Sequence, residues 1–364
     1  MARKNTIARC VVLAILSRNL HEDAASFFAR LFARIVAFFS LYRLRYITFR
    51  DDLFRRLRNE TWEIEEDEYA KSFQGPNNKE PLQAKGDMGY SGSTFYTTFD
   101  AKYLIKSVPR RFEYTFFRND LLEPFADYMA SHPASLLIRI TDFLSWRYVS
   151  LGGALGLAPT HHIVMENLLY GKEQAEKQNK NEKWETWDLK PTSYFFPERD
   201  IAGGILTSDE TKARLADKFD DKIILSPSQA DSLLAQLEED TKLLEQCNAV
   251  DYSLFLVRIP RNTPDPFANP SLDAPAAEQN PPIVPPGPPS WRTGMEARDG
   301  KYVFRAAVLD FFWAKHKTHA KAMSGLIRAW NLVFKQGPMS ITTSPEEYRA
   351  RFLRMCREIV EVKE

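Results

Sequence analysis

The first third of the chain changes from helical to extended hydrophobic patterns. Residues 48–72 place apolar side chains at helical spacing among polar ones, which predicts two short polar helices. The runs 93–99 (STFYTTF) and 102–108 (KYLIKSV) alternate or concentrate aromatic and β-branched residues, which is typical of strands. Residues 74–87 are rich in Pro, Asn and Gly, so we expect a loop before these strands.

The middle of the chain mixes both patterns. Residues 111–129 are predicted to form a helix that breaks near Pro124, because proline lacks the N–H that a helix interior uses. The apolar runs 135–150 and 161–170 are expected to be strands or buried segments. The charged stretch 173–185 is expected to be an exposed loop.

The clearest amphipathic helix covers residues 226–248 and begins at a serine N-cap. Its apolar stripe consists of Leu233, Leu234, Leu237, Leu243 and Leu244. Buried strands are predicted at 250–259 and 301–313. Two further helical patterns, 316–335 and 345–362, close the chain.

The order of these elements predicts a mixed α+β fold with two lobes around a cleft. Strands and a few helices fill residues 47–170, and mixed elements fill residues 171–362. An apolar and basic helical extension, residues 1–46, precedes them. Residues 261–297 contain a proline-dense insert that cannot hold a helix or a strand ladder, so we expect it to be disordered.

The N-terminal extension leaves alternatives open. Residues 1–16 carry basic positions before a short apolar run, which is typical of a targeting signal, but Arg9 interrupts the run and no cleavage pattern follows. Residues 24–46 are long enough to span a bilayer, yet Arg30 and Arg34 lie on one face of this otherwise apolar helix. The helix could be buried against its domain or a partner subunit, lie in a membrane surface, or span the membrane.

Composition narrows the class of protein. Hydrophobic residues make up 44% and aromatic residues 13%, so most of the chain is expected to fold. The formal net charge of +1 excludes a uniform basic coat for nucleic acid. Cys10, Cys247 and Cys356 lie far apart without metal-ligand spacing, which favours a reduced, intracellular protein without structural zinc.

Two features in the first half could bind phosphate. The stretch GYSGSTFY, residues 89–96, could fold over phosphates or form an ordinary β-turn, and it lacks the GxxxxGK[ST] pattern of a P-loop. Lys106 lies in an apolar run, so its ammonium either reaches solvent or faces an anion.

Two carboxylates in the second half complete a recognisable order of parts. Asp251 and Asp310 each lie in an apolar strand pattern, where a charge is costly unless it is paired or binds a metal. A glycine turn, a strand lysine and two such carboxylates are the parts that phosphoryl transfer uses. The protein-kinase signatures HRDxxxxN, DFG and APE are absent from the sequence.

Six motifs in one order resemble the catalytic core of the phosphatidylinositol phosphate kinases. They are GYSGSTFY, YLIKSV, HIVMENLLY, WDLKPTS, VDYSLF and VLDFFWAK, and the resemblance extends from about residue 47 to residue 362. It implies a two-lobed kinase-like fold of that family's type, with antiparallel sheets flanked by helices. It also implies ATP and Mg²⁺ as cofactors.

The resemblance implies a role for particular residues. The loop over the ATP phosphates would consist of Gly89, Ser91, Gly92 and Ser93. Lys106 would contact these phosphates, with Glu113 as its ion-pair partner. The hinge beside adenine would consist of Met165, Glu166, Asn167 and Leu168. Asp251 would face the substrate hydroxyl as a catalytic residue, and Asp310 would bind Mg²⁺.

The substrate side of the site is the divergent part. The DLKGS loop of the family reads DLKPTS here, with Asp188 and Lys190 at the rim of the site. The activation segment corresponds to residues 311–340, where Lys315, Lys317, Lys321, Arg328 and Lys335 would meet inositol phosphates and anionic lipid. The departures retain every charged group that the chemistry needs, so an active but divergent enzyme is expected.

The implied function is transfer of the ATP γ-phosphate to the inositol ring of a phosphatidylinositol monophosphate. A 4-phosphate 5-kinase is the first expectation, working from the cytoplasm at the cytosolic face of a membrane, in particular the plasma membrane. The partners would be that lipid and possible further copies of the chain in a homodimer, with no nucleic acid. The alternative is a catalytically weak or inactive kinase-fold scaffold that binds anionic membrane or partner proteins.

Overall fold

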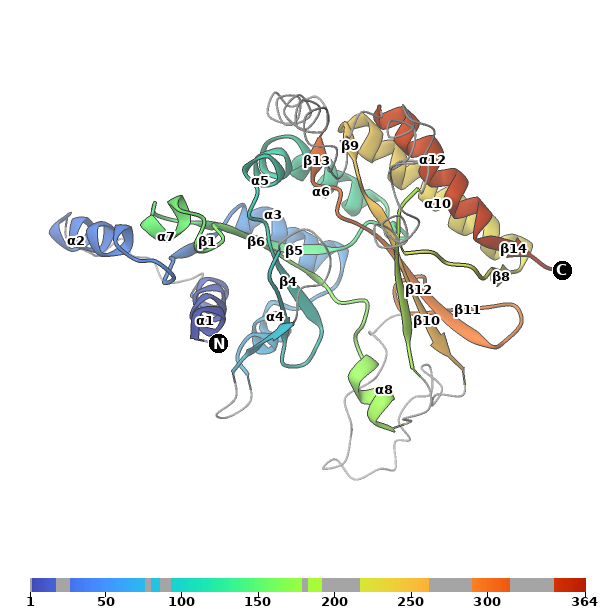
Figure 1. Cartoon of the computed structure of the whole chain (residues 1–364), viewed down its shortest axis with the longest axis horizontal. Coiled ribbons are helices and arrows are strands. Elements are labelled where there is room, and N and C mark those ends of the chain that lie inside the picture. The colour runs from blue at the N-terminus through green and yellow to red at the C-terminus, as the bar shows by residue number, and fades with distance from the viewer. Residues whose placement is uncertain are drawn as a thin grey trace, which may run out of the picture. The chain divides into compact units, whose positions relative to one another are not determined.

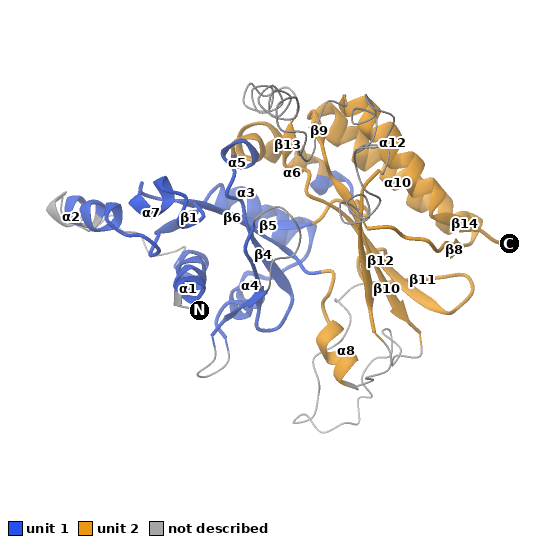
Figure 2. Ribbon diagram, in the orientation of Figure 1, with its two compact units in different colours: residues 1–114, 129–133, 139–167 blue, residues 115–128, 134–138, 168–364 orange. Residues whose placement is uncertain are grey.

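The computed structural model divides the chain into two compact units (Figure 2). Unit 1 comprises residues 1–114, 129–133 and 139–167, and unit 2 comprises residues 115–128, 134–138 and 168–364. The residues described are 2–17, 27–75, 80–85, 93–178, 183–191, 217–261, 290–314 and 344–364. The units are therefore not the contiguous lobes that the sequence predicted, because two short segments before residue 139 belong to unit 2.

A six-stranded antiparallel sheet forms the centre of unit 1, in the order β1-β5-β6-β4-β3-β2 (Figure 1). Its strands are β1 Tyr46–Thr48, β2 Leu82–Lys85, β3 Phe95–Thr98, β4 Tyr103–Ser107, β5 Ile140–Trp146 and β6 His161–Glu166. β2 lies where the sequence predicted only a loop. Its single buried apolar residue, Leu82, gives no periodic signal, and the strand exists through its pairing with β3.

The helices of unit 1 flank this sheet. They are α1 Ala2–Leu16, α2 Phe27–Phe38, α3 Asp51–Arg56 with the π-helical turn η2 Leu57–Thr61, α4 Glu66–Ser72 and α7 Leu151–Ala154. α1 buries Ile7, Val11 and Ile15 in the same core cluster as Ile105 and Val164 of the sheet. The N-terminal segment is therefore an integral part of the unit 1 core.

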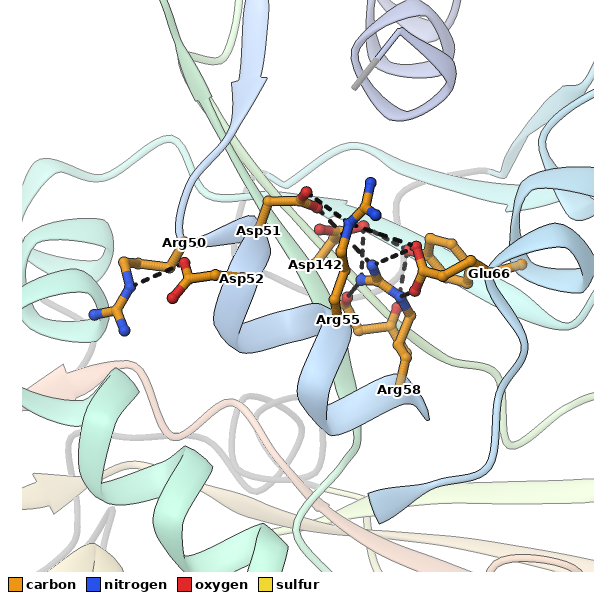
Figure 3. A network of polar contacts seen from close by, with 9 residues as sticks. Arg50, Asp51, Asp52, Arg55, Arg58, Glu66 and Asp142 are labelled. Atoms are coloured by element: carbon orange, nitrogen blue, oxygen red, sulfur yellow. Dashed lines mark hydrogen bonds and ion pairs between the residues drawn. The ribbon is translucent and has the colours of Figure 1, made fainter. Parts of the chain in front are cut away.

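A fully buried arginine joins the α3–α4 region to the sheet (Figure 3). Arg58 Nε and Nη2 donate to the two carboxylate oxygens of Glu66 at 2.6 and 3.0 Å, and Nη1 donates to the Thr141 carbonyl at 2.6 Å. The same guanidinium lies 3.4 Å from Asp142, which also accepts from the Tyr69 hydroxyl at 2.8 Å. The two polar helices predicted from sequence are thus held by a buried ionic network as well as by apolar packing.

α2 differs from the other helices because its large apolar side chains are exposed. They are Leu31, Phe32, Ile35, Val36 and Phe38, and Phe39 follows the helix. The alternative in which this helix is buried against its own domain is therefore wrong for the part of the chain that the structure describes. None of the helices in that part combines the length and the apolar composition needed to cross a bilayer.

The helix predicted over 111–129 is present but is not broken at its proline. It runs as α5 Arg111–Phe116, the π-helical turn η3 Phe117–Leu121 and α6 Leu122–Ser131. The wide turn precedes Pro124, where an ordinary helix would need the missing N–H. The backbone thus adapts one turn before the proline and continues.

Unit 2 contains a four-stranded antiparallel sheet in the order β11-β12-β10-β7. Its strands are β7 Glu185–Leu189, β10 Ser253–Pro260, β11 Met295–Glu296 and β12 Tyr302–Leu309. Two small pairs accompany it, β9 Ala249–Val250 with β13 Trp313–Ala314 and β8 Ile223–Leu225 with β14 Val360–Val362.

Two long helices lie side by side next to these strands (Figure 1). α10 Pro227–Gln246 begins with a capping box in which Ser226 and Gln229 satisfy each other's backbone N–H groups. α12 Pro345–Glu358 packs Tyr348 against Tyr252, with ring centroids 4.7 Å apart. The helix predicted at 226–248 is confirmed. Of the two helices predicted near the C-terminus, the one at 345–362 is confirmed as far as Glu358, and its last residues form the strand β14 instead.

Two further expectations for unit 2 need correction. The charged stretch 173–185 is not all loop, since α8 Lys172–Gln178 occupies its first part and buries Ala175. The end of the expected disordered insert, 290–297, is folded: Trp291 is buried and β11 pairs with β12. The rest of that insert, 262–289, lies outside the described residues. The fold class, α+β with antiparallel sheets flanked by helices, is as predicted.

Candidate active site

Strand register brings three charged residues to one edge of the unit 2 sheet. Ser253 of β10 pairs with Leu309 of β12, so Asp251 precedes one strand where Asp310 follows its neighbour. On the other side, β7 pairs with β10 and ends one residue before Lys190. The sequence placed both aspartates inside apolar strands, but the structure places them at strand ends, where they are half-buried.

Both aspartates have a left-handed backbone. The φ angle is 66° at Asp251 and 61° at Asp310, a region that aspartate enters more readily than most residues. The two strand segments pair again just beyond the aspartates, where Val250 pairs with Trp313. Fully buried Tyr252 and Phe311 follow the two aspartates and fix this irregular stretch. The irregular stretch with the two carboxylates thus separates the β10–β12 pairing from the β9–β13 pairing.

Lys190 contacts Asp251 directly. Its Nζ donates to Oδ1 and to the backbone carbonyl of Asp251, each at 2.8 Å. Burial favours the neutral amine, but the nearby carboxylates outweigh it and raise the pKa of Lys190. In order of effect these carboxylates belong to Asp251, Asp310 and Asp188. The lysine therefore stays an ammonium ion at neutral pH, within a group of three negative charges.

Asp188 lies near this group, since its carboxylate contributes to the raised pKa of Lys190. Its side chain is exposed, its backbone lies opposite Phe255 of β10, and its N–H donates to Asp217 at 2.7 Å. Residues two apart on an extended chain share a face, so Asp188 and Lys190 lie on the same side. The resemblance implied the same rim position for Lys190 as for Asp188, and it did not predict the contact of Lys190 with Asp251.

Lys106 lies in the middle of the unit 1 sheet. It is in β4, opposite Phe95 of β3 and Ile163 of β6, and only 8% of it is exposed. Its Nζ lies 5.7 Å from the centroid of the Phe95 ring. The lysine therefore does not extend freely into solvent, and its contact with ATP phosphates stays a prediction.

Only the end of the glycine-containing loop is described. Gly89, Ser91 and Gly92 lie outside the described residues, whereas Ser93 is buried. The next residue, Thr94, donates its N–H to the Ser107 hydroxyl at 2.7 Å, beside Lys106. Glu113 forms an ion pair with Arg110 at 3.3 Å. Its pairing with Lys106 remains a prediction.

The predicted hinge coincides with the place where the chain leaves unit 1. Met165 lies in β6, and Asn167 is the last residue of unit 1 before the chain returns to unit 2 at Leu168. Glu166 accepts from the Arg139 N–H at 3.0 Å through its side chain and donates its own N–H to the Arg139 carbonyl at 3.0 Å. The Glu166 carboxylate thus helps to hold the end of β6 to Arg139, the residue before β5.

The sequence analysis missed a buried arginine behind the hinge. Arg305 of β12 is fully buried, and its Nη1 donates to the carbonyls of Leu168 at 2.9 Å and Tyr170 at 2.8 Å. Its Nε donates to the Thr293 carbonyl at 3.0 Å. Burial lowers the pKa of Arg305 to about 10. A charged residue inside the apolar run KYVFRAAVL was the signal that could have found it.

Asp310, just after β12, is the described residue that we consider as a ligand for Mg²⁺. No cluster of three or more His, Cys, Asp or Glu side chains forms a metal centre among the described residues. Mg²⁺ bound with a nucleotide takes most ligands from phosphate and water and needs only one or two carboxylates. Asp310, half-buried at the open end of β12, fits that requirement. The substrate cations Lys315, Lys317, Lys321 and Arg328 lie outside the described residues.

Comparison with known proteins supports the family suggested by the six motifs. A family model described as phosphatidylinositol-4-phosphate 5-kinase matches residues 76–359. A probable phosphatidylinositol phosphate kinase of Dictyostelium discoideum is 28% identical over 204 residues, which cover 54% of this chain and 25% of that protein. The chain thus spans about a quarter of this relative's length.

The matched range includes the glycine-containing loop, the buried lysine, the hinge and both aspartates. The observed α+β architecture with antiparallel sheets is consistent with the kinase-like fold that the resemblance implied. Because the family match covers more than half of the chain, the protein belongs to the phosphatidylinositol phosphate kinase family.

Proposed function

We propose that the protein is an ATP-dependent lipid kinase that phosphorylates the inositol ring of a phosphatidylinositol monophosphate. The observation that carries this proposal is the group formed by Lys190, Asp251 and Asp310 at one sheet edge. Within the family, a 5-kinase acting on phosphatidylinositol 4-phosphate is the specific activity proposed. The protein would act from the cytoplasm at the cytosolic face of a membrane, the plasma membrane being the one proposed.

Asp251 is the residue proposed to orient the attacking hydroxyl. Lys190 holds one carboxylate oxygen at 2.8 Å, which leaves the other oxygen for the ring hydroxyl. The lysine also contacts the Asp251 carbonyl, so both the backbone and the side chain of the aspartate are fixed. A fixed acceptor lowers the entropic cost of in-line attack.

Lys106 and the glycine-containing loop are proposed to hold the ATP phosphates. A mostly buried ammonium gains more from a phosphate than an exposed one does, because water screens it less. Asp310 would hold Mg²⁺, which when bound with ATP neutralises charge on the transferred phosphoryl group. The chain from Met165 to Leu168 would lie beside adenine, with its path fixed by the Glu166 and Arg305 contacts.

The activation segment 311–340 is proposed to provide the membrane contact during catalysis, through its lysines and arginine. A homodimer of membrane-bound copies is also proposed. The competing candidate is an inactive kinase-fold scaffold, and the altered DLKPTS loop is the observation that favours it.

The direct test is a lipid-kinase assay with ATP, Mg²⁺ and vesicles that contain one phosphatidylinositol monophosphate isomer at a time. We expect bisphosphate from the 4-phosphate isomer, and we expect its formation to fall by about three orders of magnitude or more in Lys106→Ala and Asp310→Asn. Lys102→Ala is the matched control, because Lys102 precedes the same strand and its side chain is 38% exposed. Product from none of the three isomers would contradict the enzyme proposal.

Nucleotide binding separates the kinase from the scaffold. Mg·ATP should raise the melting temperature of the wild type and of Lys102→Ala, and it should leave that of Lys106→Ala unchanged. Vesicle binding without any effect of nucleotide would favour the scaffold.

A further inference from the structure

The exposed side of α2 forms a continuous apolar surface, which we call the α2 face. Its members are Leu31, Phe32, Ile35, Val36, Phe38 and Phe39. Phe32 is 69% exposed and Phe39 is 66% exposed. Next to the helix, Val149 and Leu155 on either side of α7 are 57% and 66% exposed. An apolar patch of this extent on a folded unit indicates an interaction surface.

α2 is fixed to the rest of unit 1 at its C-terminal end. The Gly152 N–H of α7 donates to the Ser40 carbonyl at 3.1 Å. A Cβ at Gly152 would collide with the backbone of Leu41, so only glycine permits this close approach. Arg34 of the helix also stacks over the Tyr148 ring, 5.6 Å from its centroid. The α2 face is therefore presented by anchored structure next to α7.

The sequence of α2, the segment after it and the segment around α7 carry charge of one sign. Residues 24–50 and 143–165 contain no Asp or Glu. Among the described residues of these two segments, the exposed arginines are Arg34, Arg43, Arg45 and Arg147. Exposed apolar side chains bordered by cations match the boundary between acyl chains and anionic headgroups in a membrane.

We propose that the α2 face docks on the surface of a membrane that contains anionic phospholipid. The aromatic side chains would enter the interface, and the arginines would meet lipid phosphates and carboxylates. A second copy of the chain fits less well, because a two-fold symmetric contact would bring the same arginines together without a carboxylate in these segments to face them. This contact is separate from the activation segment and needs neither ATP nor catalysis.

The test measures binding of the full chain, without nucleotide, to phosphatidylcholine vesicles with or without phosphatidylserine. We expect binding only to the anionic vesicles, decreasing with added salt. The double variant Phe32→Glu, Phe39→Glu should weaken it by about tenfold or more, since both exposed apolar contacts are lost. Val362→Glu is the control, because Val362 is 53% exposed but belongs to unit 2.

A position-specific probe excludes effects of the activation segment. An environment-sensitive fluorophore on Phe32→Cys, in a Cys247→Ser background because Cys10 and Cys356 are buried, should report an apolar environment with anionic vesicles only. Unchanged binding by the double variant, or an unchanged fluorophore, would overturn the proposal. So would a dimer in sedimentation that the double variant dissociates without any change in vesicle binding. Any kinase activity on micellar lipid should persist in the double variant. The vesicle-binding test does not depend on kinase activity, so a failure of the lipid-kinase proposal would leave its outcome unchanged.

Discussion

At the scale of single residues, the site depends on a lysine whose role was hidden in the sequence. Lys190 and Asp251 are 61 positions apart, and only the pairing of β7 with β10 brings them to 2.8 Å. The charge types at these positions were predictable from the motifs. Their contact was not, because it depends on register and on the left-handed turn at Asp251.

Removing this lysine should slow the reaction more than it weakens ATP binding. In Lys190→Ala we expect the turnover number to fall by about a hundredfold with little change in KM for ATP, because Asp251 loses its fixed orientation. Lys190→Arg, which keeps a cation, should retain more activity. Lys183→Ala is the control, since Lys183 is exposed shortly before β7. Equal turnover in Lys190→Ala and the wild type would show that Asp251 needs no such support.

A buried histidine, His162, contributes to the loss of stability of unit 1 at acidic pH. His162 of β6 is fully buried against Tyr46, and neither ring nitrogen has a hydrogen-bond partner among the described residues. Burial, and to a smaller extent the neighbouring His161, lowers the pKa of His162 to about 3. The unfolded chain therefore binds a proton that the folded state excludes, and this residue reduces stability as pH falls from about 6.5 toward 3.

His162→Phe should flatten this acid dependence. We expect the free energy of unfolding of the wild type to lose up to about 1.4 kcal/mol more per pH unit than that of the variant, over the range below pH 6.5. Urea unfolding at several pH values measures the difference. Parallel slopes for wild type and His162→Phe would contradict the assignment.

At the scale of elements, the local sequence pattern predicted those helices and strands whose own residues carry the signal. α10 was predictable from its serine cap and leucine stripe, and β3 and β4 from their aromatic and β-branched residues. β2 was not, because partner strands rather than its own residues define it. The buried network of Arg58 was hidden for the same reason, since its partners lie on separate elements.

The joint between α7 and the segment after α2 is sterically constrained at Gly152. Gly152→Ala should lower the free energy of unfolding by about 2 kcal/mol or more, because its Cβ meets the Leu41 backbone, which cannot rotate away. Gly156→Ala is the comparison: no atom lies near its added Cβ, so only its left-handed backbone, with φ of 69°, adds strain. A larger loss at Gly156 than at Gly152 would contradict the close packing at α7.

At the scale of the whole molecule, unit 2 depends on two short segments from the first half of the chain. Leu136 donates its N–H to the buried carboxylate of Asp240 at 2.6 Å, and Leu137 pairs with Val308 of β12. Phe117 packs on Phe312 with ring centroids 5.2 Å apart. Sequence order alone could not reveal this exchange, since the predicted lobes were contiguous.

A fragment of residues 168–364 should therefore fail to fold on its own. It lacks Phe117, which packs on Phe312, and it lacks two donors to the buried Asp240 carboxylate, Tyr128 and Leu136, so that Gln236 alone of the three donors is kept. We expect no cooperative thermal transition and rapid proteolysis of the fragment, in contrast to the full chain. A fragment of residues 115–364, which restores both segments, should recover part of the protection. Cooperative melting of 168–364 would show that these segments are dispensable.

The same exchange of segments limits how this protein can recombine with its relatives. A chimera joined at the hinge, between Asn167 and Leu168, would combine one parent's 115–128 and 134–138 with the other parent's unit 2. The Asp240 carboxylate would then meet foreign backbone at Leu136, and so would the Arg292 guanidinium, which donates to the Ser135 carbonyl. The segments that must be exchanged together in a chimera are thus defined by their contacts rather than by sequence order. A functional graft of unit 2 has to include residues 115–128 and 134–138.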